Sequence, residues 1–232
     1  MNNNPQIIIG GTWKDVSATK NLVNKENIKL ELISTEESES FIMAFELMQQ
    51  HADDSDSFKN ADSENFNCIK ISCSDNTLNA CTELMNACTK MLEKGGEITL
   101  LPLSMNMLTK DQWFEIIDED GDSTDKVIDI FTDILVDENN EDILISIGMQ
   151  SFGLKDYFID GFEDFEDAAS NLDSICRFVV GEEADIAIQE SIAIGDNNEC
   201  VYMASEPSAE MGKEDRINNQ FGYIELINIE DE

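Results

Sequence analysis

The sequence predicts an α+β fold, in which amphipathic helices pack on a mixed, mainly antiparallel sheet. Two segments, residues 75–94 and 162–180, repeat apolar residues at the three- and four-residue spacing of a helix with one buried face. Several shorter runs alternate apolar and polar residues, which is typical of strands. Because a helix follows a strand and precedes another in both halves of the chain, we also consider two similar sheet-plus-helix units.

The second of these units shows the clearest pattern. The run Ile143–Met149 has one fully apolar face and one partly apolar face, which predicts a half-buried antiparallel strand. Acidic residues crowd the first turn of the helix that follows, where unpaired backbone N–H groups carry partial positive charge, and Gly181 is expected to cap its end. The stripe expected to be buried consists of Phe165, Ala168, Ala169, Leu172, Ile175, Cys176 and Val179.

The beginning of the chain predicts two strands and a helix. Short strands are expected at residues 6–9 and 28–33, and the second alternates apolar and charged side chains. Ser34 and Glu37 have the spacing of a capping box, so a helix is expected from Ser34 to about Gln50.

The chain is expected to divide at about residue 65. Residues 1–65 form a strand-and-helix region that ends in an acidic linker, and residues 66–232 form an α+β domain packed with it as one body. The linker, residues 49–65, holds the only histidine, His51. One imidazole beside flexible acids does not make a closed metal site, so we interpret His51 as part of a solvated loop.

The first unit of the larger region begins with a strand at residues 66–74. Asp75 is expected to cap the next helix, and Gly95 and Gly96 are expected to end it. A strand at residues 98–101 completes the unit.

The region between the two units predicts a short helix and a hairpin. Thr109 is expected to cap the helix, which contains Trp113 and Phe114. Residues 127–136 alternate as a strand does, and the acidic turn at residues 137–142 is expected to lead into the next strand. Beyond Gly181 further strands are expected at residues 185–194, 200–203 and 221–229, with a polar loop at 205–220.

Three motifs of this region occur together in a known family. They are the strand FNCIKISCS with its long helix, the strand ITLLPLS before Trp113 and Phe114, and the hairpin that enters ILISIGMQSFGLKDYFI. With these motifs the chain resembles a bacterial family known as domain of unknown function 4261, over about residues 66–227. The resemblance implies an α+β fold and a bacterial origin, and it brings no activity, substrate or catalytic residue. The segment Gln189–Asp196 departs from the family, which tends to have a glycine-containing turn there.

The charge of the chain excludes several classes of partner. The net charge is −36, with 18 acidic and 9 basic residues up to Ile116 and 32 acidic and 5 basic residues after it. Such a surface repels nucleic acids and anionic membranes, which are bound by clustered lysine and arginine. We therefore expect no direct nucleic-acid binding and no membrane association. A basic partner protein or divalent cations fit this charge, and so does solubility alone.

The six cysteines indicate a reducing compartment. They contain no CxxC pair and no histidine at zinc-ligand spacing, and most of them lie on apolar faces. The N-terminus shows no signal sequence, and no apolar run reaches the roughly 20 residues that cross a membrane. We expect a cytoplasmic protein with buried, reduced thiols.

The segment DEDGDSTDKVID at residues 118–129 resembles a calcium-binding loop. Asp118, Asp120 and Asp122 occupy its first, third and fifth ligand positions. Ser123 replaces the glycine of the sharp turn and Asp129 replaces the bidentate glutamate, so the segment also fits a plain acidic loop. These three aspartates are the candidate metal ligands.

No catalytic signature and no cofactor motif is present, so catalytic activity is not predicted. We interpret Trp13 and Trp113 as packing residues. The preferred hypothesis is a non-catalytic acidic interaction module, immunity- or inhibitor-like, that docks a basic partner protein. The alternative is a small enzyme or small-molecule binder that uses a cleft between the two units, with polar residues from the crossing Gly148–Asp160. The oligomeric state is not predicted.

Overall fold

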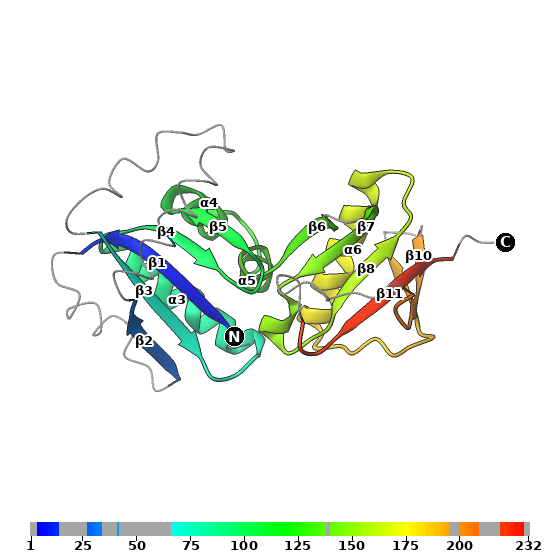
Figure 1. Cartoon of the computed structure of the whole chain (residues 1–232), viewed down its shortest axis with the longest axis horizontal. Coiled ribbons are helices and arrows are strands. Elements are labelled where there is room, and N and C mark those ends of the chain that lie inside the picture. Colours follow the sequence, from blue (N-terminus) through cyan, green and yellow to red (C-terminus); the bar gives the residue numbers. More distant parts are fainter. Residues whose placement is uncertain are drawn as a thin grey trace.

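Two β-sheets stand side by side and are joined by a layer of helices (Figure 1). The computed structural model describes residues 4–13, 27–33, 41, 66–137, 140–194, 200–208 and 219–229. The expected helix at residues 34–50, the linker at 49–65 and most of the loop at 205–220 lie largely or wholly outside these ranges. The α+β prediction is confirmed, because helices and mainly antiparallel strands form separate layers.

The first sheet is antiparallel throughout, with the strand order β2-β3-β1-β4-β5. β1 is its central strand and pairs with both β3 and β4, so residues from the start of the chain complete the first unit. The sequence did not predict β5. The strands are β1 (Gln6–Thr12), β2 (Ile28–Leu32), β3 (Phe66–Cys73), β4 (Gly96–Leu101) and β5 (Asn106–Thr109).

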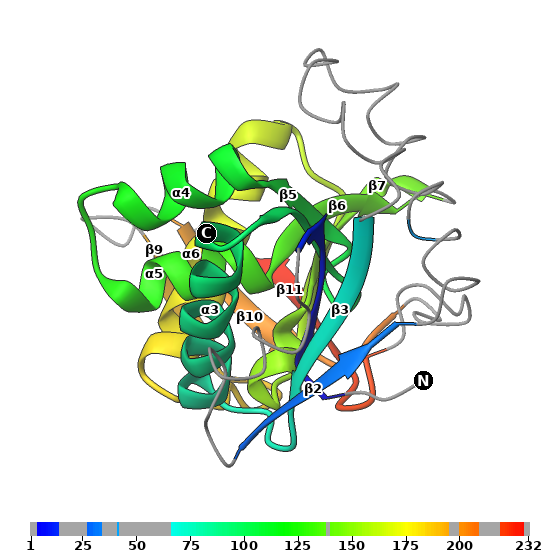
Figure 2. The ribbon, with the colours of Figure 1, turned by 90° about the vertical axis from the view of Figure 1, so that its left-hand side faces the viewer.

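Helix α3 (Leu78–Glu93) covers one face of this sheet (Figure 2). It begins at Thr77, whose side chain accepts a hydrogen bond from the Ala80 backbone N–H. Asp75 is therefore not the N-cap, because the helix begins two residues later than its position requires. The end is as expected, since Gly95 follows it with a φ of +124°. The buried stripe consists of Ala80, Cys81, Leu84, Met85, Ala87, Cys88, Met91 and Leu92.

Two short helices connect the sheets, α4 (Lys110–Asp118) and α5 (Ser123–Phe131). The prediction of a strand over residues 127–136 is wrong for its first half. The strand β6 (Asp133–Asp137) begins only after α5 ends. The alternating pattern also fits a helix, and Val127, Ile128, Ile130 and Phe131 form a stripe buried against α3, α4 and the later helix α6 (Phe165–Gly181).

The second sheet has the strand order β6-β7-β8-β11-β10-β9, with one parallel pair, β8 and β11. β7 was expected to be half-buried, but both of its faces are buried from Ile143 onward, because side chains on both sides of the sheet cover it. β9 is shorter than the predicted strand at 185–194. The remaining strands are β7 (Asn140–Ile147), β8 (Asp156–Asp160), β9 (Ser191–Ile194), β10 (Cys200–Ser205) and β11 (Tyr223–Asn228).

Helix α6 (Phe165–Gly181) covers one face of the second sheet. Asp164 caps it by accepting a hydrogen bond from the Asp167 backbone N–H at 3.1 Å. Two details of the prediction are wrong. Gly181 is the last helical residue rather than the cap, since the backbone N–H of Glu182 still bonds inside the helix. Phe165, the first residue of the helix, is 47% exposed and does not belong to the buried stripe.

The crossing from β7 to β8 joins the two units. It is a single 3-10 turn, η2 (Met149–Phe152), between Gly148 and Gly153, and all four of its residues are buried. The Asn76 side-chain amide donates to the Gln150 carbonyl at 2.6 Å, and the Cys81 thiol donates to the Ser151 carbonyl at 3.3 Å. One hydrophobic core therefore runs from the first sheet through α3, η2 and α5 to α6 and the second sheet. The strand orders of the two units differ.

We predict that Gly148→Ala destabilises the protein more than Gly161→Ala does. Both glycines have positive φ values, +95° and +75°. A Cβ at Gly148 would stand 2.1 Å from the backbone oxygen of Phe131, whereas nothing lies within 4 Å at Gly161. Urea unfolding is expected to show a cost of about 1 kcal/mol at Gly161 and about 2 kcal/mol more at Gly148. Equal losses would show that the Gly148 turn has room to relax.

Candidate functional site

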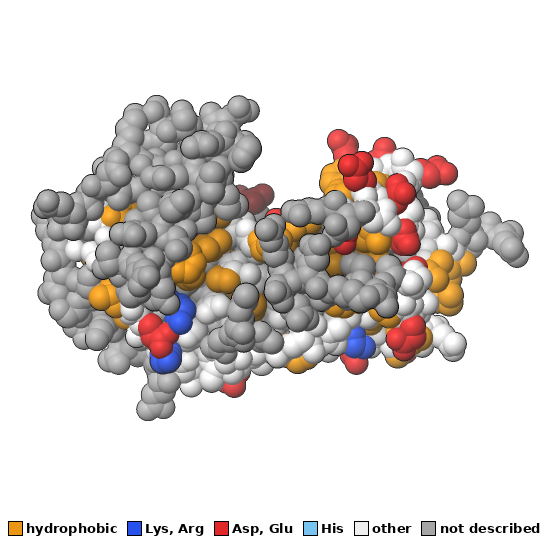
Figure 3. Space-filling model, in the orientation of Figure 1, with side chains coloured by type: hydrophobic (Ala, Val, Ile, Leu, Met, Phe, Trp, Pro, Cys, Tyr) orange, Lys and Arg blue, Asp and Glu red, His pale blue; other side chains and the backbone are white. Residues whose placement is uncertain are grey.

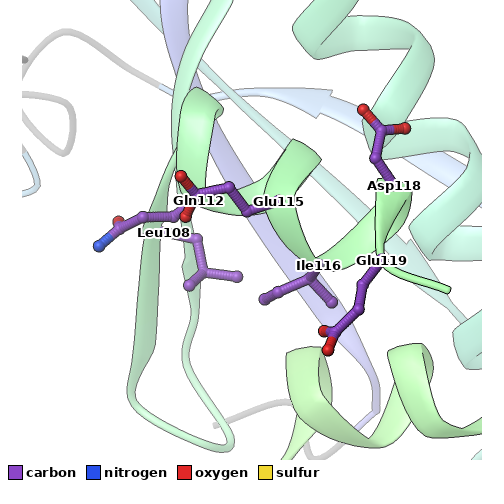
Figure 4. Close-up of a pocket in the computed structure, with 6 residues that line it drawn as sticks. All are labelled: Leu108, Gln112, Glu115, Ile116, Asp118 and Glu119. Atoms are coloured by element: carbon purple, nitrogen blue, oxygen red, sulfur yellow. The ribbon is translucent and has the colours of Figure 1, made fainter. Parts of the chain in front are cut away.

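A shallow hollow of about 680 Å³ lies along the outer side of α4 (Figure 4). In Figure 4 the side chains of Leu108 and Ile116 point toward each other, while Asp118 points away from this apolar pair. The hollow thus has an apolar floor and an acidic rim. Its lining residues are Leu108, Gln112, Glu115, Ile116, Asp118 and Glu119.

The local sequence explains why this face of α4 is exposed and fixed. Thr109 and Gln112 form a complete capping box, which holds the first turn of the helix. Trp113 is fully buried on the opposite face, and its indole N–H donates to the Thr89 hydroxyl at 3.0 Å. Lys126 donates to the carbonyl of Ile117 at 2.6 Å and so satisfies the end of the helix. The exposed, acidic face of α4 therefore belongs to a helix whose two ends and opposite face are fixed by contacts with the rest of the protein.

Six exposed acids follow one another along α4 and the loop after it. We call this stretch the α4 acidic segment, and its members are Asp111, Glu115, Asp118, Glu119, Asp120 and Asp122. The three candidate metal ligands belong to it. Asp118 ends α4, Asp120 lies in the loop, and Asp122 caps α5 by accepting a hydrogen bond from the Thr124 N–H at 2.8 Å.

The three aspartates do not gather around one point. Within the ranges that the structure describes, no three histidine, cysteine or acidic side chains stand close enough to hold a metal ion. α5 begins at Ser123, which is the sixth position of the calcium-loop pattern. Calcium binding by Asp118, Asp120 and Asp122 stays a prediction, and nothing in their arrangement adds to it.

An arginine ties this region to the second unit. Arg177 of α6 donates from Nε to Asp173 at 2.7 Å, from Nη1 to Asp125 at 3.2 Å and from Nη2 to Asp129. Burial opposes the charge of the guanidinium, but the bonds to Asp173 and Asp129 outweigh this and raise the pKa of Arg177. The sequence analysis missed this contact, although Asp173 and Arg177 have the four-residue spacing of a helical ion pair.

A second group of exposed acids surrounds an aromatic pair at the N-terminal end of α6. The rings of Phe162 and Phe165 meet edge to face, with centroids 6.2 Å apart. Acidic side chains gather at this end of the second unit in Figure 3, at the upper right. The exposed acids of this segment are Asp160, Glu163, Asp164, Glu166 and Asp167.

The expected cleft between the units is filled where the crossing passes. Met149 and Ser151 of the crossing are buried at 0% and 1% exposure, and the core continues across it. The hollows beside α4, between α6 and β9, and next to Arg177 include no residue of Gly148–Asp160. Three polar residues of the crossing, Gln150, Ser151 and Asp156, are buried in the described structure, whereas Asp160 is exposed.

The most perturbed carboxyl group lies in this junction and was missed by the sequence analysis. Asp156 is 2% exposed, and its two oxygens accept hydrogen bonds from the Met149 N–H at 3.1 Å and the Asn219 side-chain amide at 2.8 Å. Burial raises its pKa to about 7, although both bonds act in the opposite direction. Asn219 also donates to the Leu154 carbonyl at 3.0 Å. Asp156 thus holds the crossing to the turn before β11.

The cysteines and tryptophans have structural positions. None of the six thiols forms a disulfide, and all but Cys200 are buried. Burial raises the pKa of Cys176 to about 12, so this thiol stays protonated and is a poor nucleophile. Trp13 and Trp113 are 4% and 0% exposed, which confirms that they pack in the core.

His51 lies outside the described residues. No helix within the described ranges is long and apolar enough to cross a membrane.

We predict that Asp156 makes the stability of the protein depend on pH. Because the pKa of the folded state lies near 7 and that of the unfolded state near its ordinary value of 3.8, the folded protein keeps a proton that the unfolded chain releases. The free energy of unfolding is expected to fall by up to about 4 kcal/mol as the pH rises from about 4 to about 7. Asp156→Asn removes this part of the decline, as urea unfolding at several pH values would show.

Asp160→Asn is the matched control for this measurement, since Asp160 is an exposed residue of the same strand. Its pH profile is expected to follow that of the unchanged protein. If the profile of Asp156→Asn also follows it, Asp156 is not the group responsible.

We predict that Arg177→Met lowers the free energy of unfolding by about 1 kcal/mol, because it leaves three carboxylates, each partly exposed to solvent, without their common cation. Asp173→Asn removes only one of the contacts and is expected to cost less. Arg177→Lys restores only part of the loss, since one amine cannot reproduce three separate N–H contacts. Urea unfolding of the three variants tests this, and full rescue by lysine would contradict it.

Comparisons with models of known protein families, with curated proteins and with solved structures find no match to this chain. The resemblance to domain of unknown function 4261 stays a prediction.

Proposed function

We propose that the protein is a non-catalytic interaction module, immunity- or inhibitor-like, which docks a basic partner protein in the bacterial cytoplasm. The observation that carries this proposal is the α4 acidic segment. Three of its six exposed acids, Glu115, Asp118 and Glu119, line a hollow with an apolar floor, and the opposite face of α4 is anchored by a buried tryptophan. Acidic surface and apolar contact area are therefore presented together.

These two features contribute differently to binding. Exposed carboxylates attract a basic protein over several ångströms and raise the rate of association, and this effect falls as salt is added. Apolar side chains such as Leu108 and Ile116 give affinity once water is expelled from between the partners. A partner segment that contains lysine or arginine together with an aliphatic residue would contact the carboxylates and the apolar floor at the same time.

The nearby basic residues leave the acids available. Lys126 is engaged with the carbonyl of Ile117, and Arg177 is engaged with Asp125, Asp129 and Asp173. The last three carboxylates thus serve the fold and are not part of the proposed docking surface. Glu119, Asp120 and Asp122 of the α4 acidic segment line the hollow next to Arg177, but the ion pairs of Arg177 are made with Asp125, Asp129 and Asp173.

We predict that neutralising three acids of the α4 acidic segment weakens capture of the basic partner. The variant is Glu115→Gln, Asp118→Asn and Glu119→Gln, compared with the unchanged protein in affinity capture from the native host at rising salt. The unchanged protein is expected to retain a basic protein at low salt and release it at high salt. The variant is expected to capture at least about tenfold less of the basic protein than the unchanged protein does, because each exposed charge contributes to the local potential.

The matched control removes the same charge elsewhere. Glu93→Gln, Glu141→Gln and Asp142→Asn neutralises three exposed acids outside the segment. The control is expected to capture the partner as the unchanged protein does. Equal loss in both variants would mean that overall charge, and not this surface, attracts the partner. Capture of no basic protein at low salt would contradict the proposal as a whole.

A further inference from the structure

A groove of about 810 Å³ lies between the C-terminal half of α6 and the strand β9. Phe178, which is 49% exposed, forms one wall, and Ile192 and Ile194 of β9 form the other. Ile186, which is buried, lies at its base. The groove therefore has apolar side chains on both walls, together with polar lining from Ser174, Asp185, Glu190 and Ser191, and it is open to solvent.

The groove runs along the free edge of a sheet. β9 is the last strand of the second sheet in the described structure, and its other edge pairs with β10. The backbone N–H of Ala204 donates to the carbonyl of Glu190, which lies opposite it. Because bonded pairs alternate in an antiparallel ladder, the backbone groups of Ser191 and Ala193 point away from β10. A further strand can therefore pair with these two residues.

The charge around the groove selects the kind of strand that fits. Asp185 and Glu190 line it, and Glu182 and Glu183 are exposed at the end of α6. The C-terminal end of a helix also carries partial negative charge. A second copy of this chain would bring a net charge of −36 against the same acids. An extended segment with basic residues is complementary, and another copy of the chain is not.

We propose that β9 accepts an extended segment of the basic partner as an additional strand of the second sheet. Apolar side chains of the segment, at every second position, lie in the groove against Phe178 and Ile192, and lysine or arginine side chains meet Asp185 and Glu190. Main-chain hydrogen bonds to Ser191 and Ala193 give such a complex affinity, and the groove gives it specificity. The proposal rests on the proposed function for the basic charge of the partner, and it adds a second contact, separate from the α4 acidic segment, at which the partner is extended.

A synthetic peptide that alternates lysine and valine tests this proposal. Binding is followed by NMR of the full-length protein, with amide hydrogen exchange as the readout at individual residues. The amides of Ser191 and Ala193 are expected to exchange at least about tenfold more slowly with the peptide bound, because they become hydrogen-bonded. A peptide with glutamate in place of lysine is expected to leave their exchange unchanged.

Two pairs of variants locate the site. Phe178→Ser is expected to weaken peptide binding by about tenfold or more, because it removes one wall of the groove. Phe165→Ser is the matched control, since Phe165 is a phenylalanine of the same helix with a similar exposure of 47%. The affinity of this variant for the lysine peptide is expected to be unchanged. Ala193→Pro removes one outward N–H from an edge strand, which tolerates proline, and is expected to weaken binding without unfolding the protein.

Three outcomes would overturn the proposal. One is binding of the lysine peptide that leaves Ser191 and Ala193 unprotected and is lost in the triple variant at Glu115, Asp118 and Glu119. In that case the proposed function stands and the strand site fails. Another is equally tight binding of the glutamate peptide. The third is concentration-dependent self-association of the protein alone that Ala193→Pro abolishes, which would make a second copy the occupant of the edge.

Discussion

The close contact between the β7–β8 crossing and α3 holds the two halves of the molecule in one core. Gly148 lets the chain turn against the backbone of Phe131 with no space for a side chain, and the buried residues Met149–Phe152 then pack under α3. The Cys81 thiol donates to the buried carbonyl of Ser151, and Asn76 adds a second hydrogen bond to the Gln150 carbonyl, which also accepts from the Gly153 N–H. Because this junction is filled, the two sheets behave as parts of one folded body.

The described acids fall into two groups, those that take part in the fold and those that are exposed on the surface. At the junction between the units, both carboxylate oxygens of Asp156 accept hydrogen bonds, and the pKa of Asp156 is raised. Asp125, Asp129 and Asp173 form ion pairs with Arg177. The other described acids stand mostly in water, where they cost little and attract opposite charge. The proposed docking surfaces follow from this arrangement. The α4 acidic segment offers charge beside a shallow apolar floor, and the groove beside β9 offers apolar walls and a free sheet edge.

Much of the candidate surface could be expected from the sequence, and its organisation could not. The acidic run from Asp118 to Asp122 is visible as a motif, and Thr109 with Gln112 signals the helix that carries it. Asp156 looks like any other acid of an acidic chain, because burial and the contact with Asn219 join residues far apart in sequence. Arg177 is similar, since its spacing from Asp173 is local, whereas its contacts with Asp125 and Asp129 depend on how α5 packs on α6.

The sequence by itself determined the fold class, the two long helices and most strands, because apolar spacing and capping residues act within one element. It could not decide between strand and helix at residues 127–136, where both periods fit and packing between α3 and α6 selects the helix. The tertiary structure alone decided that β1 stands at the centre of the first sheet and that β9 is the outer strand of the second. Strand order depends on contacts between distant segments, and local periodicity carries no information about them.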